Sequence, residues 1–401
     1  MGIALFPLQF LALRIYGSSF DVSSILIILF ISLLVLKILF LDVSGKNKKT
    51  VSLILIFLGI QLLLFLINDT PLFRFVSGLV WFGGLLLVYL FKNDIKIDFQ
   101  IVHKIISHTI FISALIMIFE WFLHKRPKAF FDEPSYASVA IYSISSAYFG
   151  CFIFFEDLDK KKNKLYLLGC FYFFVGLLTT SMHIISFNIV MCLFLLIASN
   201  KRKVLYVLGS ILIIYFVSSK IVSFDDIYNR ISSVKLVSIT KPSSYQDLEK
   251  NFNRSTMAWL DGYEQAKAAL KINPIVGLGL GSTGYFKYDS NYNQLLINVY
   301  KSNPNRFDSY SGFFRLIIEL GLIFGALVLL LLLKNILKIY RDRSVLISKV
   351  NYEIFFIRFF SLTLFIGILI KEPVYSRSLV YVATLLFSTS FIGSIKEKPF
   401  K

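Results

Sequence analysis

Charged residues are scarce in this chain of 401 residues, because only 16% are Asp, Glu, Lys or Arg while 56% are hydrophobic. Soluble globular proteins carry about 25% charged residues. The mean hydropathy of +0.72 also lies above the range of soluble domains. This composition excludes an ordinary soluble enzyme and predicts an integral membrane protein.

Cysteine and histidine are also rare, with three and four residues respectively. The cysteines lie inside apolar runs without CxxC spacing, which excludes a disulfide framework and a zinc knuckle. The histidines show no HxH or HxxxH spacing. We therefore predict no metal and no cofactor, and we interpret the cysteines as packing residues: Cys151, Cys170 and Cys192.

Long apolar runs dominate what remains, and most are long enough to cross about 30 Å of hydrocarbon as a helix. They predict an all-α polytopic membrane protein with about twelve transmembrane helices. The runs cover residues 3–17, 22–41, 50–67, 73–92, 101–123, 136–155, 165–181, 183–199, 204–219, 309–333, 352–370 and 376–394.

Basic residues exceed acidic ones, 42 to 24, which gives a net charge of +18. A nucleic-acid partner is not expected, since the lysines form short runs between spans rather than one basic face. Cytoplasmic loops of membrane proteins are rich in Lys and Arg. Runs such as "SGKNKK", "DKKKNK" and "NKRK" therefore place both ends in the cytoplasm and residues 220–308 outside. This divides the chain into an N-terminal bundle (1–219), a large extracytoplasmic loop (220–308) and a C-terminal part (309–401).

The large outer loop is expected to contain a helix with Asn253 as N-cap, ending before Asn273 and Pro274. Its packed face is predicted from the spacing of Met257, Leu260, Tyr263 and Leu270. The following "GLGLGSTG" has the GxGxxG spacing of dinucleotide sites, but no clear strand precedes it. We interpret it as a tight backbone turn.

Several cations are expected at the outer surface. Arg254 falls in the first turn of the loop helix, where free N–H groups favour an anion. Arg315 falls one to two turns into an apolar span, so it should face the bundle interior or an aqueous cavity. Together with Arg306 and Arg377, these residues indicate an anionic head group as ligand.

Carboxylates lie at the outer ends of two spans. Asp132 and Glu133 precede Pro134, which fits the first position of a helix and would hold Glu133 toward a cavity. Either acid could instead cap that helix. Glu372 lies in the short connection before the last span.

The segments "FFDEPSYAS", "LTTSMHIISF", "NRSTMAW", "NPIVGLGLGSTGYF" and "SYSGFFRLIIELGLIFG" together resemble the O-antigen polymerase and ligase superfamily, most closely the Wzy-type polymerases. The resemblance covers topology over most of the chain and motifs within residues 130–140, 176–190 and 250–325. It implies a multi-spanning glycosyltransferase of GT-C-like architecture in the bacterial inner membrane, with its active site facing the periplasm.

The resemblance further implies that donor and acceptor are oligosaccharides linked to undecaprenyl diphosphate, polymerised without metal or nucleotide sugar. Arg254 would then stabilise the leaving diphosphate, as would Arg315 and Arg377, and Glu133 would be the general base. Alternative bases are Asp308, Glu372 and Asp132. Substrate-binding roles extend to Arg306, Glu372 and Tyr310. A protein that regulates chain length is left open as a partner.

The chain departs from the ligase pattern in one place. Ligases of the superfamily usually have His-Asn about ten residues before the Glu-Leu-Gly end of the last motif, where this chain has Tyr310 and Ser311. This favours a polymerase over a ligase. A flippase or transporter of lipid-linked oligosaccharides is the alternative from another functional class.

Overall fold

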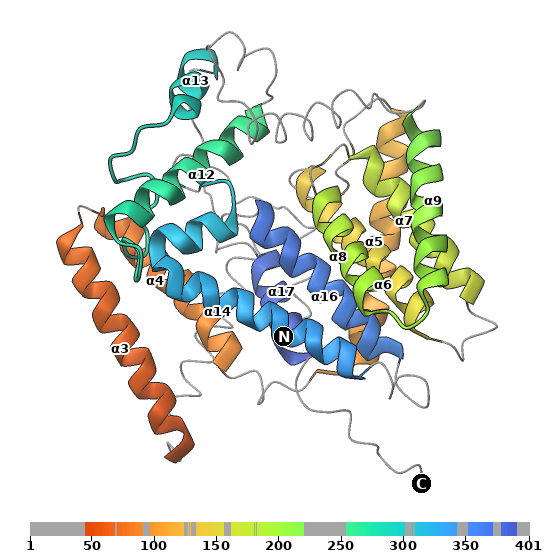
Figure 1. Cartoon of the computed structure of the whole chain (residues 1–401), viewed down its shortest axis with the longest axis horizontal. Helices are drawn as coiled ribbons and strands as arrows, with labels where there is room; N and C mark the ends of the chain where they lie inside the picture. The colour runs from red at the N-terminus through yellow and green to blue at the C-terminus, as the bar shows by residue number, and fades with distance from the viewer. Residues whose placement is uncertain are drawn as a thin grey trace.

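The computed structural model describes residues 45–68, 70–90, 97–123, 127, 129, 134–155, 162–179, 181, 183–219, 254–300, 307, 309–342, 352–371 and 378–390. Within this part of the chain the protein is all-helical, with twelve helices and no strand (Figure 1). The helices are α3 (Gly45–Ile67), α4 (Leu72–Leu90), α5 (Phe99–Phe122), α6 (Pro134–Phe154), α7 (Lys162–Leu178), α8 (Ile184–Ile197), α9 (Lys201–Ser219), α12 (Arg254–Ile272), α13 (Asn291–Tyr300), α14 (Gly312–Asp342), α16 (Tyr352–Lys371) and α17 (Ser378–Thr389).

Ten of the predicted apolar runs coincide with helices, from α3 to α9 and in α14, α16 and α17. The runs at 3–17 and 22–41 lie outside the described residues. Within the described ranges, four helices are long and apolar enough to cross a membrane: α5, the Ala137–Phe154 part of α6, α14 and α16. The total of twelve crossings stays a prediction.

Helices α6 and α16 form the centre of the bundle. They pack against each other, and α16 also contacts α5, α8, α14 and α17. Gly150 of α6 makes this contact close, because a Cβ there would meet the Phe359 ring at 2.5 Å. Small residues at helix contacts allow such approach in membrane bundles. The aromatic side chains of α16 are thereby enclosed on several sides.

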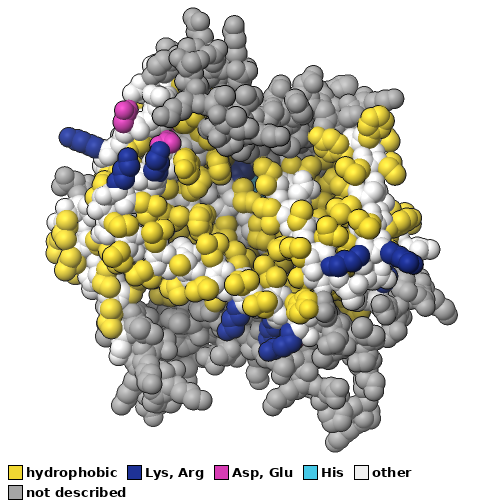
Figure 2. Space-filling model, viewed as in Figure 1, with side chains coloured by type: hydrophobic (Ala, Val, Ile, Leu, Met, Phe, Trp, Pro, Cys, Tyr) yellow, Lys and Arg dark blue, Asp and Glu magenta, His cyan; other side chains and the backbone are white. Residues whose placement is uncertain are grey.

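Large apolar side chains are exposed on the outer helices. Leu66 of α3, Phe216 of α9 and Leu330 of α14 are 74%, 69% and 59% exposed. Figure 2 shows hydrophobic side chains across the middle of one face, with most of its visible charged side chains toward the borders. A protein that is apolar both inside and outside is suited to lipid rather than water.

Helix α14 differs from the single continuous span predicted for residues 309–333. Its backbone breaks at Gly321, which has a φ of 72° and a ψ of −170°. A short helical part therefore precedes a longer apolar part that continues to Asp342. Arg315 lies in the short part, before the break, rather than inside an uninterrupted span.

Helices α12 and α13 lie together at one end of the molecule (Figure 1). The start of α12 at Arg254 and its end at Ile272 confirm the predicted loop helix. Met257 and Leu260 are buried as expected, but the prediction was wrong for Tyr263, which is 47% exposed. Its ring still meets the Phe314 ring of α14 edge-on, with ring centres 6.0 Å apart, so Tyr263 lies at the border of the packed face rather than within it.

Candidate functional site

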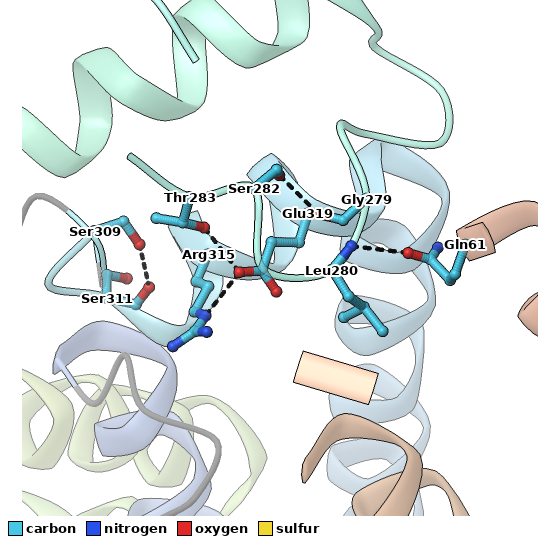
Figure 3. Close-up of polar contacts among 9 residues, drawn as sticks. All are labelled: Gln61, Gly279, Leu280, Ser282, Thr283, Ser309, Ser311, Arg315 and Glu319. Carbon is cyan, nitrogen blue, oxygen red and sulfur yellow. Dashed lines mark hydrogen bonds and ion pairs between the residues drawn. The ribbon is translucent and has the colours of Figure 1, made fainter. Parts of the chain in front are cut away.

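A buried ion pair lies in the short first part of α14. Arg315 Nε donates to Glu319 Oε1 at 2.9 Å, one helical turn further on. Thr283 Oγ1 donates to the same oxygen at 2.9 Å from the loop between α12 and α13. Figure 3 shows the two donors converging on the Glu319 carboxylate. The carboxylate therefore ties this loop to the start of α14.

The second Glu319 oxygen, Oε2, is buried and makes no hydrogen bond within the described part of the protein. Glu319 is fully buried, and the side chain of Arg315 is 11% exposed. A buried carboxylate oxygen without a donor is costly. This oxygen can accept a hydrogen bond from a ligand, while the guanidinium offsets the charge of the carboxylate.

Two strained residues precede α14. Ser309 and Tyr310 have φ values of 52° and 57°, in the left-handed region that non-glycine residues rarely adopt. Gly262 of α12 allows this path, because a side chain there would overlap the Ser309 carbonyl oxygen. Consecutive residues of this kind persist where the surrounding structure determines them, and they cluster at functional sites.

The C-terminal end of α16 joins the same region. Ser311 Oγ donates to Leu369 O at 2.7 Å, and Trp259 Nε1 donates to Ile370 O at 3.2 Å. These donors satisfy carbonyl groups that the end of a helix leaves unpaired. Lys371 Nζ lies 5.7 Å from the centre of the Tyr310 ring, a cation–π distance. We name Tyr310, Arg315, Glu319, Thr283 and Lys371 the helix-end cluster.

His183 occupies the turn between α7 and α8, near the end of α16. It is 3% exposed, and its Nδ1 has no hydrogen-bond partner within the described residues. Gly367 of α16 lies beside the ring: a Cβ there would reach Nδ1 at 3.4 Å, an ordinary contact, but would overlap Val139 Cγ2 of α6. Burial lowers the pKa of His183 well below its usual range, and the nearby Lys371 lowers it further. The imidazole is therefore neutral at physiological pH.

The glycine-rich segment 277–284, named here the glycine loop, holds the break in α14. Leu278 N and Gly279 N donate to Ile318 O and Glu319 O at 2.8 and 3.0 Å. On the other side of the break, Leu322 N donates to Pro274 O at 2.9 Å. The residues just before and within the glycine loop thus pair with groups that the interrupted helix leaves free.

The glycine loop also contacts α3. Leu280 N donates to Gln61 Oε1 at 2.9 Å (Figure 3), and Asn68 Nδ2 donates to Leu278 O at 2.8 Å. All four of its glycines have positive φ, between 71° and 93°. This confirms the interpretation of "GLGLGSTG" as a backbone turn.

The structure places only part of the predicted site. Tyr310 and Arg315 lie close in the chain, and both belong to the helix-end cluster. Arg254 is the first residue of α12, and its side chain lies outside the described part. The other predicted site residues also lie outside the described residues: Glu133, Arg306, Asp308, Glu372 and Arg377.

The sequence did not lead us to predict Glu319, Thr283 or His183 as site residues. Glu319 carried a usable signal, because it is an acid four residues after Arg315 within an apolar run. Thr283 carried none, since its contact joins positions 36 apart. His183 could be recognised as buried only once α6, α8 and α16 were seen to pack together.

Neither the protein-family models nor the curated proteins include a match to this chain. Among the described residues, no group of three or more His, Cys, Asp or Glu side chains could hold a metal ion.

Proposed function

We propose that the protein is a polymerase of surface polysaccharide that joins oligosaccharide repeat units linked to undecaprenyl diphosphate. The helix-end cluster would lie on the periplasmic side of the bacterial inner membrane. The growing chain would be transferred from its lipid diphosphate to a hydroxyl at the non-reducing end of a new unit. Undecaprenyl diphosphate would leave.

One observation carries this proposal. A buried guanidinium–carboxylate pair, Arg315 with Glu319, lies at the end of an apolar bundle next to two non-glycine residues with positive φ. Charged side chains in such bundles are costly, and they mark substrate pathways and functional sites. The strained backbone supports the same conclusion, because strain of this kind concentrates at functional sites.

The cations suit the departure of a diphosphate. As the bond between the anomeric carbon and the phosphate oxygen breaks, negative charge develops on the leaving group. Fixed cations and donors that point at this charge are a large source of catalysis. Arg315 and Lys371 of the helix-end cluster would contribute, together with Arg254 and Arg377.

The acceptor hydroxyl must lose a proton as it attacks. Glu133 is the proposed general base, with Asp308, Glu372 and Asp132 as alternatives. Pro134 begins α6, so Glu133 directly precedes that helix. No metal takes part in this scheme.

The test is a polymerisation assay with the purified protein in proteoliposomes. Its substrate is the undecaprenyl diphosphate repeat unit of the organism that encodes the chain. We expect a ladder of products that differ by one repeat unit, separated by gel electrophoresis. Transfer of the substrate between leaflets without a ladder would contradict the proposal and indicate a flippase. Attachment of a finished polymer to lipid A core would indicate a ligase.

A further inference from the structure

A cavity of about 280 Å³ opens between the α3–α4 turn and the glycine loop. We propose that it is a subsite for a sugar ring of the lipid-linked glycan, an inference that rests on the proposed function. None of the residues that line the cavity belongs to the helix-end cluster. The lining residues are Ile67, Asn68, Thr70, Leu278, Ser282, Tyr285, Phe286 and Lys287.

The size of the cavity limits the ligand. Pockets for drug-sized molecules measure about 300–1,000 Å³, so this cavity lies just below the lower limit. It can hold one or two sugar rings but not a whole oligosaccharide with its lipid. The remaining units of a glycan would extend through its open side.

The lining offers the two kinds of contact that a sugar ring needs. Thr70, Ser282 and Tyr285 contribute hydroxyl groups. Ser282 Oγ already donates to Gly279 O at 2.7 Å, so it offers a ligand only its acceptor lone pairs. Tyr285 and Phe286 contribute aromatic rings, which suit the C–H faces of a pyranose. A sugar has hydroxyl edges and apolar faces, so it matches such a mixed surface.

Other ligand classes fit the lining less well. Lys287 is the one charged side chain among the lining residues, and it is exposed. A diphosphate is better served by the buried guanidinium of Arg315. A polyprenyl tail would need an apolar wall, whereas five of the eight lining side chains carry polar groups.

The position of the cavity agrees with a role beside the helix-end cluster. Ser282 lines the cavity. The next residue, Thr283, donates to Glu319 Oε1 at 2.9 Å (Figure 3). A glycan whose diphosphate lay near Arg315 could therefore place a sugar here. The lysine run in the first turn of α3 lies at the opposite end of that helix, about 30 Å away by helical rise.

The wall of the cavity is held in place before any ligand binds. Gly281 packs so closely on α4 that a Cβ would meet Arg74 O at 2.5 Å. Asn68 bridges Leu64 O and Leu278 O through its amide nitrogen, at 3.0 and 2.8 Å. A preformed pocket loses less free energy to ordering when it binds a ligand.

Saturation-transfer NMR on the purified full chain tests the subsite. The probe is the free repeat-unit oligosaccharide, released from the organism's own polysaccharide. We expect Tyr285→Ala to weaken binding about tenfold or more, since it removes a ring and a hydroxyl. Tyr206→Ala is the matched control, because that tyrosine is 61% exposed on α9; it should bind as the wild type does.

A second variant, Lys287→Ala, tests the subsite even if Tyr285→Ala does not fold. It removes an exposed side chain that lines the cavity. We expect it to weaken oligosaccharide binding about threefold to tenfold, the effect of losing one hydrogen bond. Wild-type protein that does not bind the oligosaccharide would overturn the subsite. Folded variants with unchanged affinity would also overturn it.

The polymerisation assay separates this inference from the proposed function. A ladder whose KM for the repeat unit is the same in wild type and Tyr285→Ala would contradict the subsite and leave the polymerase intact. Binding that depends on Tyr285 without any ladder would support the subsite and contradict the polymerase.

Discussion

At the residue scale, Arg315 and Glu319 neutralise each other's charge in a buried ion pair. The guanidinium donates to a carboxylate that is fully buried, and the remaining carboxylate oxygen has no donor among the described residues. Removing one partner of a buried pair leaves a charge uncompensated, which costs about 3–5 kcal/mol. A single substitution therefore affects both folding and any catalysis, and the two effects must be measured separately.

Arg315→Lys keeps a positive charge but loses the Nε–H donor and the planar fork of the guanidinium. We expect the rate of polymerisation to fall about 10²- to 10³-fold, as when one transition-state donor is lost. Initial rates in proteoliposomes measure this. Lys267→Ala, on the exposed side of α12, is the control and should keep the wild-type rate. A folded Arg315→Lys protein with the wild-type rate would contradict the role of Arg315.

The lowered pKa of His183 predicts how the free energy of unfolding depends on pH. Its folded pKa lies well below that of the unfolded chain, about 6.5. As pH falls below about 6.5, the unfolded chain binds a proton that the folded protein excludes, so stability falls. The free energy of unfolding falls by at most about 1.4 kcal/mol per pH unit, and the fall ends once pH reaches the pKa of His183 in the folded protein.

Melting temperatures of the wild type and of His183→Asn between pH 7 and pH 5 test this expectation. The wild type should lose more stability across that range than the variant, which has no imidazole to protonate. Ser210→Ala, remote from His183 on α9, should follow the wild type. If the melting temperatures of the wild type and of His183→Asn changed with pH in parallel, the folded protein would protonate His183 as readily as the unfolded chain does, which would contradict this expectation.

At the scale of elements, the break in α14 is the feature that builds the site. Gly321 has a positive φ, and a Cβ there would overlap the Ile275 carbonyl oxygen. The break directs Arg315 and Glu319 toward the glycine loop, while the longer part of the helix presents an apolar surface. The loop in turn pairs with the backbone on both sides of the break.

Gly321→Ala should therefore lower the melting temperature, since it combines a strained φ with a backbone clash worth about 1–3 kcal/mol or more. It should also reduce polymerisation by displacing Arg315. Gly209→Ala is the matched control, because a Cβ there has nothing within 4 Å and alanine favours helices. Equal stability of the two variants would show that the break is not required.

The elements that follow from local pattern could be predicted from the sequence. Apolar runs predicted ten helices, and Arg254 and Ile272 bound α12 as expected. The break at Gly321 could not be predicted, because the apolar pattern continues through it. Nor could the contact of Thr283 with Glu319, since it depends on two segments meeting in space. Most other predicted site residues lie outside the described part, so their roles stay predictions.

At the scale of the whole molecule, a periplasmic polymerase requires a particular side of the membrane for each end of the helix bundle. The basic runs at the start of α3 and α9 predict one cytoplasmic end. The glycine loop, the cavity and the helix-end cluster gather near α12, which the charge pattern places on the other side. A polymerase that receives lipid-linked units in the periplasm requires this orientation.

Cysteine labelling in intact cells tests this orientation most directly. Cys151, Cys170 and Cys192 are first replaced by serine, and a single cysteine is then introduced at Lys287 or at Arg202, both exposed. We expect Lys287→Cys to react with a membrane-impermeant maleimide in intact cells, and Arg202→Cys to react only after permeabilisation. The reverse pattern would place the glycine loop in the cytoplasm and contradict the proposed periplasmic polymerase.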